Sequence, residues 1–130
     1  MRYIMSCLAI AVITLGSVQS AQGEPKLIAV KFHGDWCGSC KKMGSVFTDL
    51  TNKLDGTPVL FVELDRTNNT TSHQSSLLAS ALGLGDVYQS NPGTGFILLI
   101  DGKTREITGK LTAGMGLKQM AAEIETRIGL

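Results

Sequence analysis

Two cysteines separated by two residues, directly behind a tryptophan, constrain this chain more than any other feature. The motif at 36–40 (WCGSC) follows a short apolar run at 26–32 (KLIAVKF) that only Lys31 interrupts. Such a run predicts a strand that is buried on both faces. A cysteine pair at this spacing, between a strand and a helix-like segment, is typical of thiol–disulfide chemistry.

The segment behind the first cysteine predicts a helix that covers a sheet. Its apolar residues recur at spacings of three and four: Met43, Val46, Phe47, Leu50 and Leu54. If the helix begins at Cys37, unpaired N–H groups and the positive end of the helix dipole point at its sulfur and favour the reactive thiolate. Cys40 follows on the same helical face, within reach of a mixed disulfide at Cys37. We therefore expect Cys37 to be the nucleophile and Cys40 the resolving cysteine.

Other uses of a cysteine pair fit this sequence less well. A structural zinc site needs four ligands, and only His33 and His73 could supplement the cysteines, so we expect no metal. Haem attachment needs a histidine directly after the second cysteine, where this chain has Lys41. An inert structural disulfide remains an alternative, although a short loop at a helix start is the geometry of a reactive pair.

The segment at 29–43 (AVKFHGDWCGSCKKM) resembles the active-site strand, turn and helix of the thioredoxin superfamily, whose signature is a tryptophan followed by CGxC. The resemblance extends more weakly over residues 26–130. Together with the run at 75–85 (SSLLASALGLG), it is closest to secreted thioredoxin-like domains such as the C-terminal domain of the membrane reductant conductor DsbD. It implies a thioredoxin-like fold, disulfide exchange with protein substrates, and no cofactor besides the redox-active disulfide Cys37–Cys40, but it does not identify the partner.

The remaining patterns predict an α/β fold in the order βαβαββα, with a mixed sheet of about four strands and helices on both faces. Asp101-Gly102 is a hairpin-turn signal, and Ser72 or Thr71 can cap the middle helix, which Gly83 or Gly85 ends. The further elements expected are strands at 58–64, 96–100 and 105–111, a loop at 65–72, and helices at 73–82 and 117–128.

The N-terminus has the pattern of a secretory signal peptide over residues 1–20. Arg2 precedes an apolar stretch at 3–15, and small and polar residues follow. We expect cleavage at Ser20/Ala21, or near Gly23, ahead of a thioredoxin-like domain at 24–130.

This segment predicts where the protein works. The stretch is shorter than the ~20 residues of a membrane span, and retention as an N-terminal anchor is the alternative. Removal of the signal would take Cys7 with it, so both remaining cysteines lie in the motif. We expect secretion into an oxidising compartment, most simply a bacterial periplasm.

Composition limits the partners. A chain of 130 residues with 43% hydrophobic residues suffices for one core, and a net charge of +1 gives no sign of a nucleic-acid surface. We expect a monomer that exchanges disulfides with proteins and with an unidentified electron donor or acceptor, a membrane reductase being one candidate.

Lys31 departs from the family pattern. Thioredoxins carry a buried aspartate six residues before the first cysteine, and this chain has a lysine there. If Lys31 points beneath the motif, its charge would favour thiolate at Cys40, and desolvation would make a neutral amine available as a base. Alternatively, Lys31 extends along the sheet to meet Glu63 or Asp65.

Within the motif, Trp36, Gly38 and Ser39 are expected to support the cysteines. Ser39 stands where ordinary thioredoxin has proline, and it adds an N–H and a hydroxyl that can approach the Cys37 sulfur. Trp36 is expected to pack beside the pair and shape the docking surface.

The segment Pro92-Gly93-Thr94-Gly95 is the candidate for the substrate-binding loop, which in this family carries a cis-proline facing the cysteines. Either Pro92 is cis and followed by an insertion, or Thr94 occupies the family's proline position. The two glycines permit close approach of another backbone, so a peptide could bind this loop as an added strand.

Two other functions remain open. A copper-handling protein would use Cys37 and Cys40 with Met43 or His33 as ligands. A non-catalytic interaction module would retain the fold for docking alone. We favour the oxidoreductase, with the reducing direction preferred because of the family resemblance.

Overall fold

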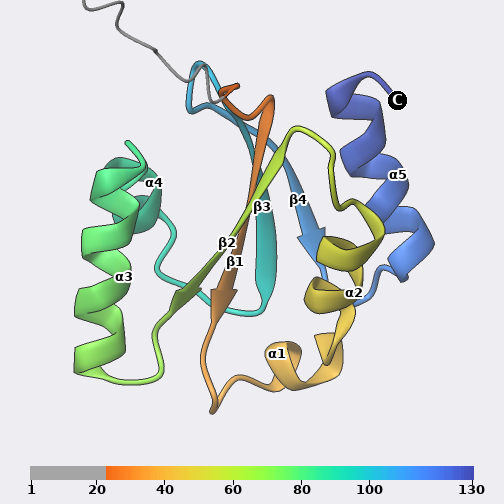
Figure 1. The fold of residues 1–130 in the computed structure, drawn as a ribbon. Helices are drawn as coiled ribbons and strands as arrows, with labels where there is room; N and C mark the ends of the chain where they lie inside the picture. Colours follow the sequence, from red (N-terminus) through yellow and green to blue (C-terminus); the bar gives the residue numbers. More distant parts are fainter. Residues whose placement is uncertain (1–22) are drawn as a thin grey trace, which may run out of the picture.

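A computed structural model describes residues 23–130, in which four strands form one mixed sheet (Figure 1). The strand order is β2-β1-β3-β4. β1 pairs in parallel with β2 and antiparallel with β3, and β3 pairs antiparallel with β4. The strands are β1 (Leu27–His33), β2 (Val59–Asp65), β3 (Phe96–Asp101) and β4 (Ile107–Thr112). The predicted α/β class and mixed sheet are confirmed, whereas the predicted signal peptide at 1–20 and Cys7 lie outside the described residues.

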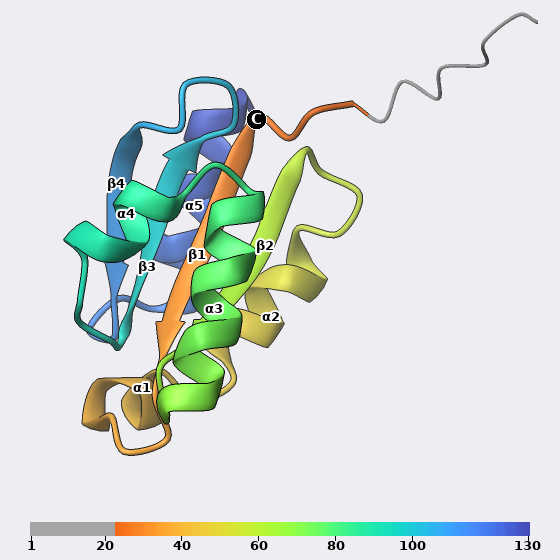
Figure 2. The ribbon, with the colours of Figure 1, turned by 90° about the vertical axis from the view of Figure 1, so that its left-hand side faces the viewer.

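Five helices surround this sheet in the described part of the chain. They are α1 (Gly38–Met43), α2 (Val46–Lys53), α3 (Asn69–Ala81), α4 (Gly85–Ser90) and α5 (Leu117–Ile128). α3 and α4 cover one face, and α2 and α5 cover the other (Figures 1 and 2). α1 lies beyond the carboxyl end of β1, at one end of the molecule (Figure 2).

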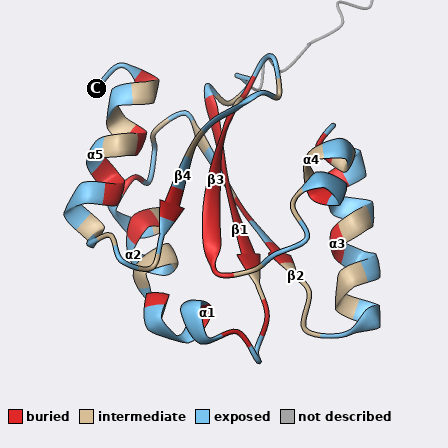
Figure 3. Ribbon diagram, turned by 180° about the vertical axis from the view of Figure 1, so that it is seen from behind, coloured by how far each residue is buried: buried red, intermediate tan, exposed pale blue. Residues whose placement is uncertain are grey.

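The two central strands are buried on both sides (Figure 3). Side chains alternate along β1, so Leu27 and Ala29 pack with α2 and α5, while Ile28, Val30 and Phe32 pack with α3 and α4. Because β1 packs in both hydrophobic cores, its last residues have little conformational freedom. The cysteine motif therefore begins from a rigid support.

The helix predicted as one segment behind Cys37 is two helices. Gly44 has φ 55° and ψ −126°, a conformation that ends α1, and α2 begins two residues later at Val46. Met43 and Leu50 nevertheless belong to the same core, which explains why the apolar period continues across the break.

The middle helix begins earlier than predicted. α3 starts at Asn69 and is capped by Asn68, whose side-chain oxygen accepts a hydrogen bond from Thr71 N–H at 3.0 Å. Thr71 Oγ1 in turn accepts one from Asn68 N–H at 3.1 Å, which completes a capping box. Thr71 and Ser72 are thus inside the helix, and the predicted loop is correspondingly shorter. Helix α4, six residues long, was not predicted.

Candidate active site

The cysteine pair lies at the N-terminus of α1, where the chain leaves β1. Cys37 is the N-cap, and its Sγ accepts a hydrogen bond from the backbone N–H of Cys40 at 3.1 Å. A disulfide joins the two residues, with their Cα atoms 5.2 Å apart. The prediction that the helix begins at Cys37 is confirmed, and the helix N-terminus supplies a donor to this sulfur.

The two sulfurs have different surroundings. Cys37 Sγ faces a backbone donor, which stabilises a negative charge. Cys40 Sγ lies 3.7 Å from the carbonyl oxygen of Phe32, an acceptor to which a reduced Cys40 thiol can donate. Both residues are buried, at 6% and 4% exposure. The geometry therefore favours thiolate at Cys37 and thiol at Cys40 when the disulfide is open.

Gly95 is the residue of the predicted substrate loop that comes closest to the cysteines. A Cβ added to it would lie 3.0 Å from Cys37 Sγ and 2.5 Å from the Cβ of Ser39. Its φ of +84° is one that other residues rarely adopt, and its N–H donates to Phe32 C=O at 2.8 Å. Only glycine allows the backbone to pass this close to the disulfide.

Of the two alternatives for this loop, the one with a cis Pro92 is not found, because residues 23–130 contain no cis peptide bond. Pro92, Gly93 and Thr94 precede Gly95 in the same irregular segment between α4 and β3. Gly38, by contrast, is the first residue of α1, and a Cβ on it would meet no atom within 4 Å. Gly95 therefore provides the close backbone contact that the resemblance assigns to the family's proline position.

Lys31 adopts the second of its two predicted arrangements. Its Nζ donates to Glu63 Oε2 at 3.0 Å, since the parallel register places the two residues side by side. The residue is only 7% exposed, and its ammonium lies 5.5 Å from the centre of the Phe47 ring. Glu63 thus balances the charge of Lys31 directly, and Asp65 takes no part.

A second network ties the turn before Cys37 to the end of β2. His33 Nε2 lies 3.0 Å from Asp35 Oδ1, and Asp35 N–H donates to Thr67 Oγ1 at 3.0 Å. Trp36 Nε1 donates to Thr67 C=O at 3.1 Å, while 64% of Trp36 remains exposed. Trp36 thus presents an open ring next to the cysteines.

Thr67 was not singled out from the sequence. Its N–H donates to Asp65 Oδ1 at 2.7 Å, which is an Asx-type turn directly after a strand. The pattern Asp-x-Thr behind an apolar run is the signal that could have indicated it.

Asp65 has a perturbed carboxyl group. Partial burial acts to raise the pKa of Asp65, but hydrogen bonds from Thr67 and the charge of His33 outweigh it and hold the pKa below its ordinary 3.8. A carboxylate with a lowered pKa stabilises the fold above the ordinary pKa, and this stabilisation is lost as the pH falls through the folded-state value.

We expect Asp65→Asn to lower the free energy of unfolding at pH 7 and to have a smaller effect at pH 3. The asparagine amide keeps an oxygen that can accept from Thr67 N–H but carries no charge. The variant therefore loses only the part of the stabilisation that depends on the charge of the carboxylate. Urea denaturation at the two pH values measures the difference. A gap between wild type and variant that does not change with pH would contradict the assignment.

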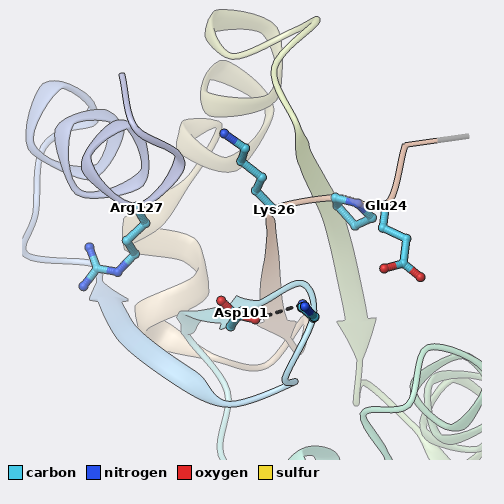
Figure 4. Close-up of a pocket in the computed structure, with 6 residues that line it drawn as sticks. Glu24, Lys26, Asp101 and Arg127 are labelled. Atoms are coloured by element: carbon cyan, nitrogen blue, oxygen red, sulfur yellow. Dashed lines mark hydrogen bonds between the residues drawn. The ribbon is translucent and has the colours of Figure 1, made fainter.

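A separate hollow of about 380 Å³ lies at the other end of the sheet, away from the cysteines (Figure 4). Two of its charged residues already have partners, since Lys26 Nζ contacts Ile128 C=O at 3.4 Å and Asp101 Oδ1 accepts from Lys103 N–H at 2.9 Å. The lining residues are Glu24, Pro25, Lys26, Asp101, Lys103 and Arg127. We therefore place the functional site at the cysteines.

Within the described residues, no three His, Cys, Asp or Glu side chains are grouped as metal ligands would be. Met43 packs into the core with α2 and α5, and His33 is engaged with Asp35.

In the part of the chain that the structure describes, no helix has the length and apolar character to cross a bilayer.

Comparison with known proteins shows which family this chain is similar to. The sequence model of the Thioredoxin family matches residues 17–78. Protein disulfide-isomerase 1 of Caenorhabditis elegans is 40% identical over 50 residues, covering 38% of this chain and 10% of that protein. Thioredoxin of Ictalurus punctatus is 40% identical over 40 residues, covering 31% of this chain and 37% of that protein. The chain therefore spans well under two thirds of either relative.

Solved structures show the same fold. A point mutant of thioredoxin from Halobacterium salinarum has a TM-score of 0.52 at 21% identity, with 82% of this chain and 78% of that chain covered. The reduced thioredoxin pre-protein of Schistosoma mansoni has a TM-score of 0.51 at 22% identity, with 82% and 84% covered.

The fold is thus thioredoxin-like, with a CxxC pair at the N-terminus of the helix that follows β1. Together with the family match over residues 17–78, these features make the chain similar to the thioredoxin superfamily. The narrower resemblance to the C-terminal domain of DsbD stays a prediction.

Proposed function

We propose that this protein is an extracytoplasmic thiol–disulfide oxidoreductase that exchanges disulfides with protein substrates. The observation that carries the proposal is the N-cap geometry: Cys37 Sγ accepts the Cys40 N–H at 3.1 Å and is bonded to the one other cysteine of the motif. A capping sulfur with a backbone donor is a good thiolate, and its neighbour is placed to complete the exchange.

The reducing reaction proceeds in two balanced steps. The Cys37 thiolate attacks one sulfur of a substrate disulfide, forms a mixed disulfide, and releases the other substrate sulfur as a thiolate. Cys40 loses its proton and attacks the Cys37 sulfur, which forms the Cys37–Cys40 disulfide and releases the second substrate thiolate. Two electrons pass to the substrate. An external dithiol then reduces the protein, and the same steps in reverse describe oxidation.

Substrate recognition is assigned to the surface around the pair. Trp36 offers an exposed ring on one side, and the loop at 92–95 offers backbone groups on the other. An extended segment that carries a disulfide can pair with this backbone as an added strand. Gly95 then brings the bound segment close to the Cys37 sulfur.

The extracytoplasmic location is supported by the signal-like pattern at 1–20, with an uncleaved membrane anchor as the alternative. We favour the reducing direction, a monomer, and a membrane reductase as electron donor, because of the resemblance to secreted reductant-passing domains. Fractionation of cells that express the full chain, with sequencing of the mature N-terminus, tests the location.

Turnover with a protein disulfide tests the activity. Reduced protein is mixed with insulin, and dithiothreitol regenerates the dithiol. We expect insulin reduction well above the rate with dithiothreitol alone, with stoichiometric conversion of Cys37 and Cys40 to the disulfide in a single turnover without dithiothreitol. Insulin reduction no faster than the dithiothreitol background would reject the proposal, and stoichiometric Cu(I) binding would then favour copper handling.

Replacing Ser39 by proline is expected to lower the reduction potential. Proline removes the N–H and the hydroxyl that a serine at this position can direct to the Cys37 thiolate, so the reduced form loses stabilisation. Equilibration with glutathione buffers measures the potential. Ser39→Ala, which keeps the N–H, is the matched control and should shift less. An unchanged or higher potential in the proline variant would contradict this account of Ser39.

A further inference from the structure

Arg66 connects the strand that carries the motif to the loop that faces it. Its backbone N–H donates to His33 C=O at 2.8 Å, directly before the turn to the cysteines. Its guanidinium reaches α4 and the segment behind it, where Nη2 donates to the C=O of Tyr88 in α4 at 2.7 Å and to Asn91 C=O at 3.0 Å. Nη1 donates to Pro92 C=O at 3.2 Å. One side chain thus binds one carbonyl of α4 and two carbonyls at the start of the loop.

The guanidinium is also held by aromatic rings. Its central carbon lies 4.0 Å from the centre of the Tyr88 ring and 5.4 Å from that of Phe32. Among residues 23–130, Arg66 forms no ion pair with a carboxylate, so its charge is directed to main-chain oxygens. The planar guanidinium group has several N–H donors and can bind these main-chain carbonyls together better than a lysine ammonium group could.

The loop is therefore held at both ends. Arg66 binds its start at Asn91 and Pro92, and Phe32 C=O binds its end at the Gly95 N–H. Between these points, within the described part of the chain, the N–H groups of Gly93 and Thr94 donate to no carbonyl. They are available to a bound backbone.

We propose that Arg66 is a positioning residue that sets the place of the loop at 91–95 over the disulfide and so determines the affinity for protein substrates. This inference rests on the proposed oxidoreductase function. Arg66 does not contact either sulfur in the structure, so it is expected to act on the bound peptide and not on the thiol chemistry. A small disulfide that needs no loop should not depend on it.

The test compares Arg66→Met and Arg66→Lys with a matched control, Arg105→Met. Arg105 also donates to main-chain carbonyls, to Leu82 at 2.9 Å and to Gly102, but it lies at the hairpin turn, at the end of the sheet away from the cysteines. For Arg66→Met we expect KM for insulin to rise roughly ten-fold with little change in kcat. The rate with a small aromatic disulfide and the reduction potential should stay at wild-type values.

Arg66→Lys should recover part of the affinity, and Arg105→Met should keep the wild-type KM. If Arg66→Met fails to fold, Arg66→Lys is compared with Arg105→Met instead, and a smaller rise in KM for insulin is expected. An equal loss toward insulin and the small disulfide, or an unchanged KM in both Arg66 variants, would overturn the inference.

Amide hydrogen exchange separates this inference from the proposed function. Even if the wild type does not reduce insulin, the amide of Gly95, which donates to Phe32 C=O, should exchange faster in the Arg66 variants than in wild type or Arg105→Met. Unchanged exchange at this amide would overturn the positioning role by itself.

Discussion

Cys37→Ser is expected to lower turnover of a protein disulfide by roughly three orders of magnitude or more, because no other thiolate in the described part of the chain is placed to attack the substrate. Cys40 cannot substitute for it, since its sulfur faces the Phe32 carbonyl and not a backbone donor. The measurement is steady-state reduction of insulin, with circular dichroism to show that the variant is folded.

Cys40→Ser is the matched control for this prediction. It also abolishes steady turnover, but it leaves Cys37 able to attack once, so a mixed disulfide with the substrate should accumulate. Non-reducing electrophoresis and mass spectrometry detect this adduct. If Cys40→Ser yields no adduct, while Cys37→Ser does, the assigned roles of the two cysteines are reversed.

Gly95→Ala is expected to have the largest effect outside the cysteines. The added methyl would overlap the Ser39 side chain at 2.5 Å and approach Cys37 Sγ at 3.0 Å, in a backbone with φ +84°. The backbone conformation alone costs about 1–2 kcal/mol for a residue with a Cβ, and the overlap adds about 1–3 kcal/mol. The loop must retreat from the disulfide, so protein-disulfide turnover should fall together with stability.

Gly56→Ala is the control for Gly95→Ala. Gly56 has φ +76°, but a Cβ on it would meet no atom within 4 Å, so only the conformational cost applies. Urea denaturation should therefore show a smaller loss for Gly56→Ala, and its insulin reduction should match wild type. Equal losses of stability, or full activity in Gly95→Ala, would contradict the close contact between this loop and the cysteines.

The order of the four strands, with α3 and α5 among them, could be predicted from the apolar pattern of each segment, whereas α4 was not predicted and α1 and α2 were predicted as one helix. The run at 26–32 is apolar almost throughout and forms a strand between two cores, and the position of Cys37 at a helix start follows from what flanks it. The helix boundaries that were predicted wrongly depend on interactions between residues close together in the sequence. Gly44 breaks a helix whose apolar period continues beyond it, and Asn68 with Thr71 caps a helix from within a polar stretch that looks like a loop.

The loop opposite the cysteines could not be placed from the sequence. Pro92, Thr94 and the two glycines could each lie next to the cysteines, and local conformational preferences do not determine which of them does. The choice comes from long-range pairing, because β3 lies antiparallel to β1 and brings Gly95 to the carbonyl of Phe32. Arg66 was missed for the same reason, since its partners lie 22 to 26 residues further along the chain.

The position of the Lys31 side chain could be predicted only in part from the sequence. Two arrangements fitted the sequence, and the parallel register of β1 with β2 selects the pair with Glu63. The charge reversal relative to the family pattern is thus compensated within the sheet.

The most direct test of this account is the rate of alkylation of reduced Cys37 by iodoacetamide as a function of pH, measured in the Cys40→Ser variant. The backbone donor at 3.1 Å and the helix N-terminus predict a titration midpoint below the value of about 8.5 for a free cysteine. A midpoint at or above that of a free cysteine would contradict the claim that the start of α1 activates this sulfur.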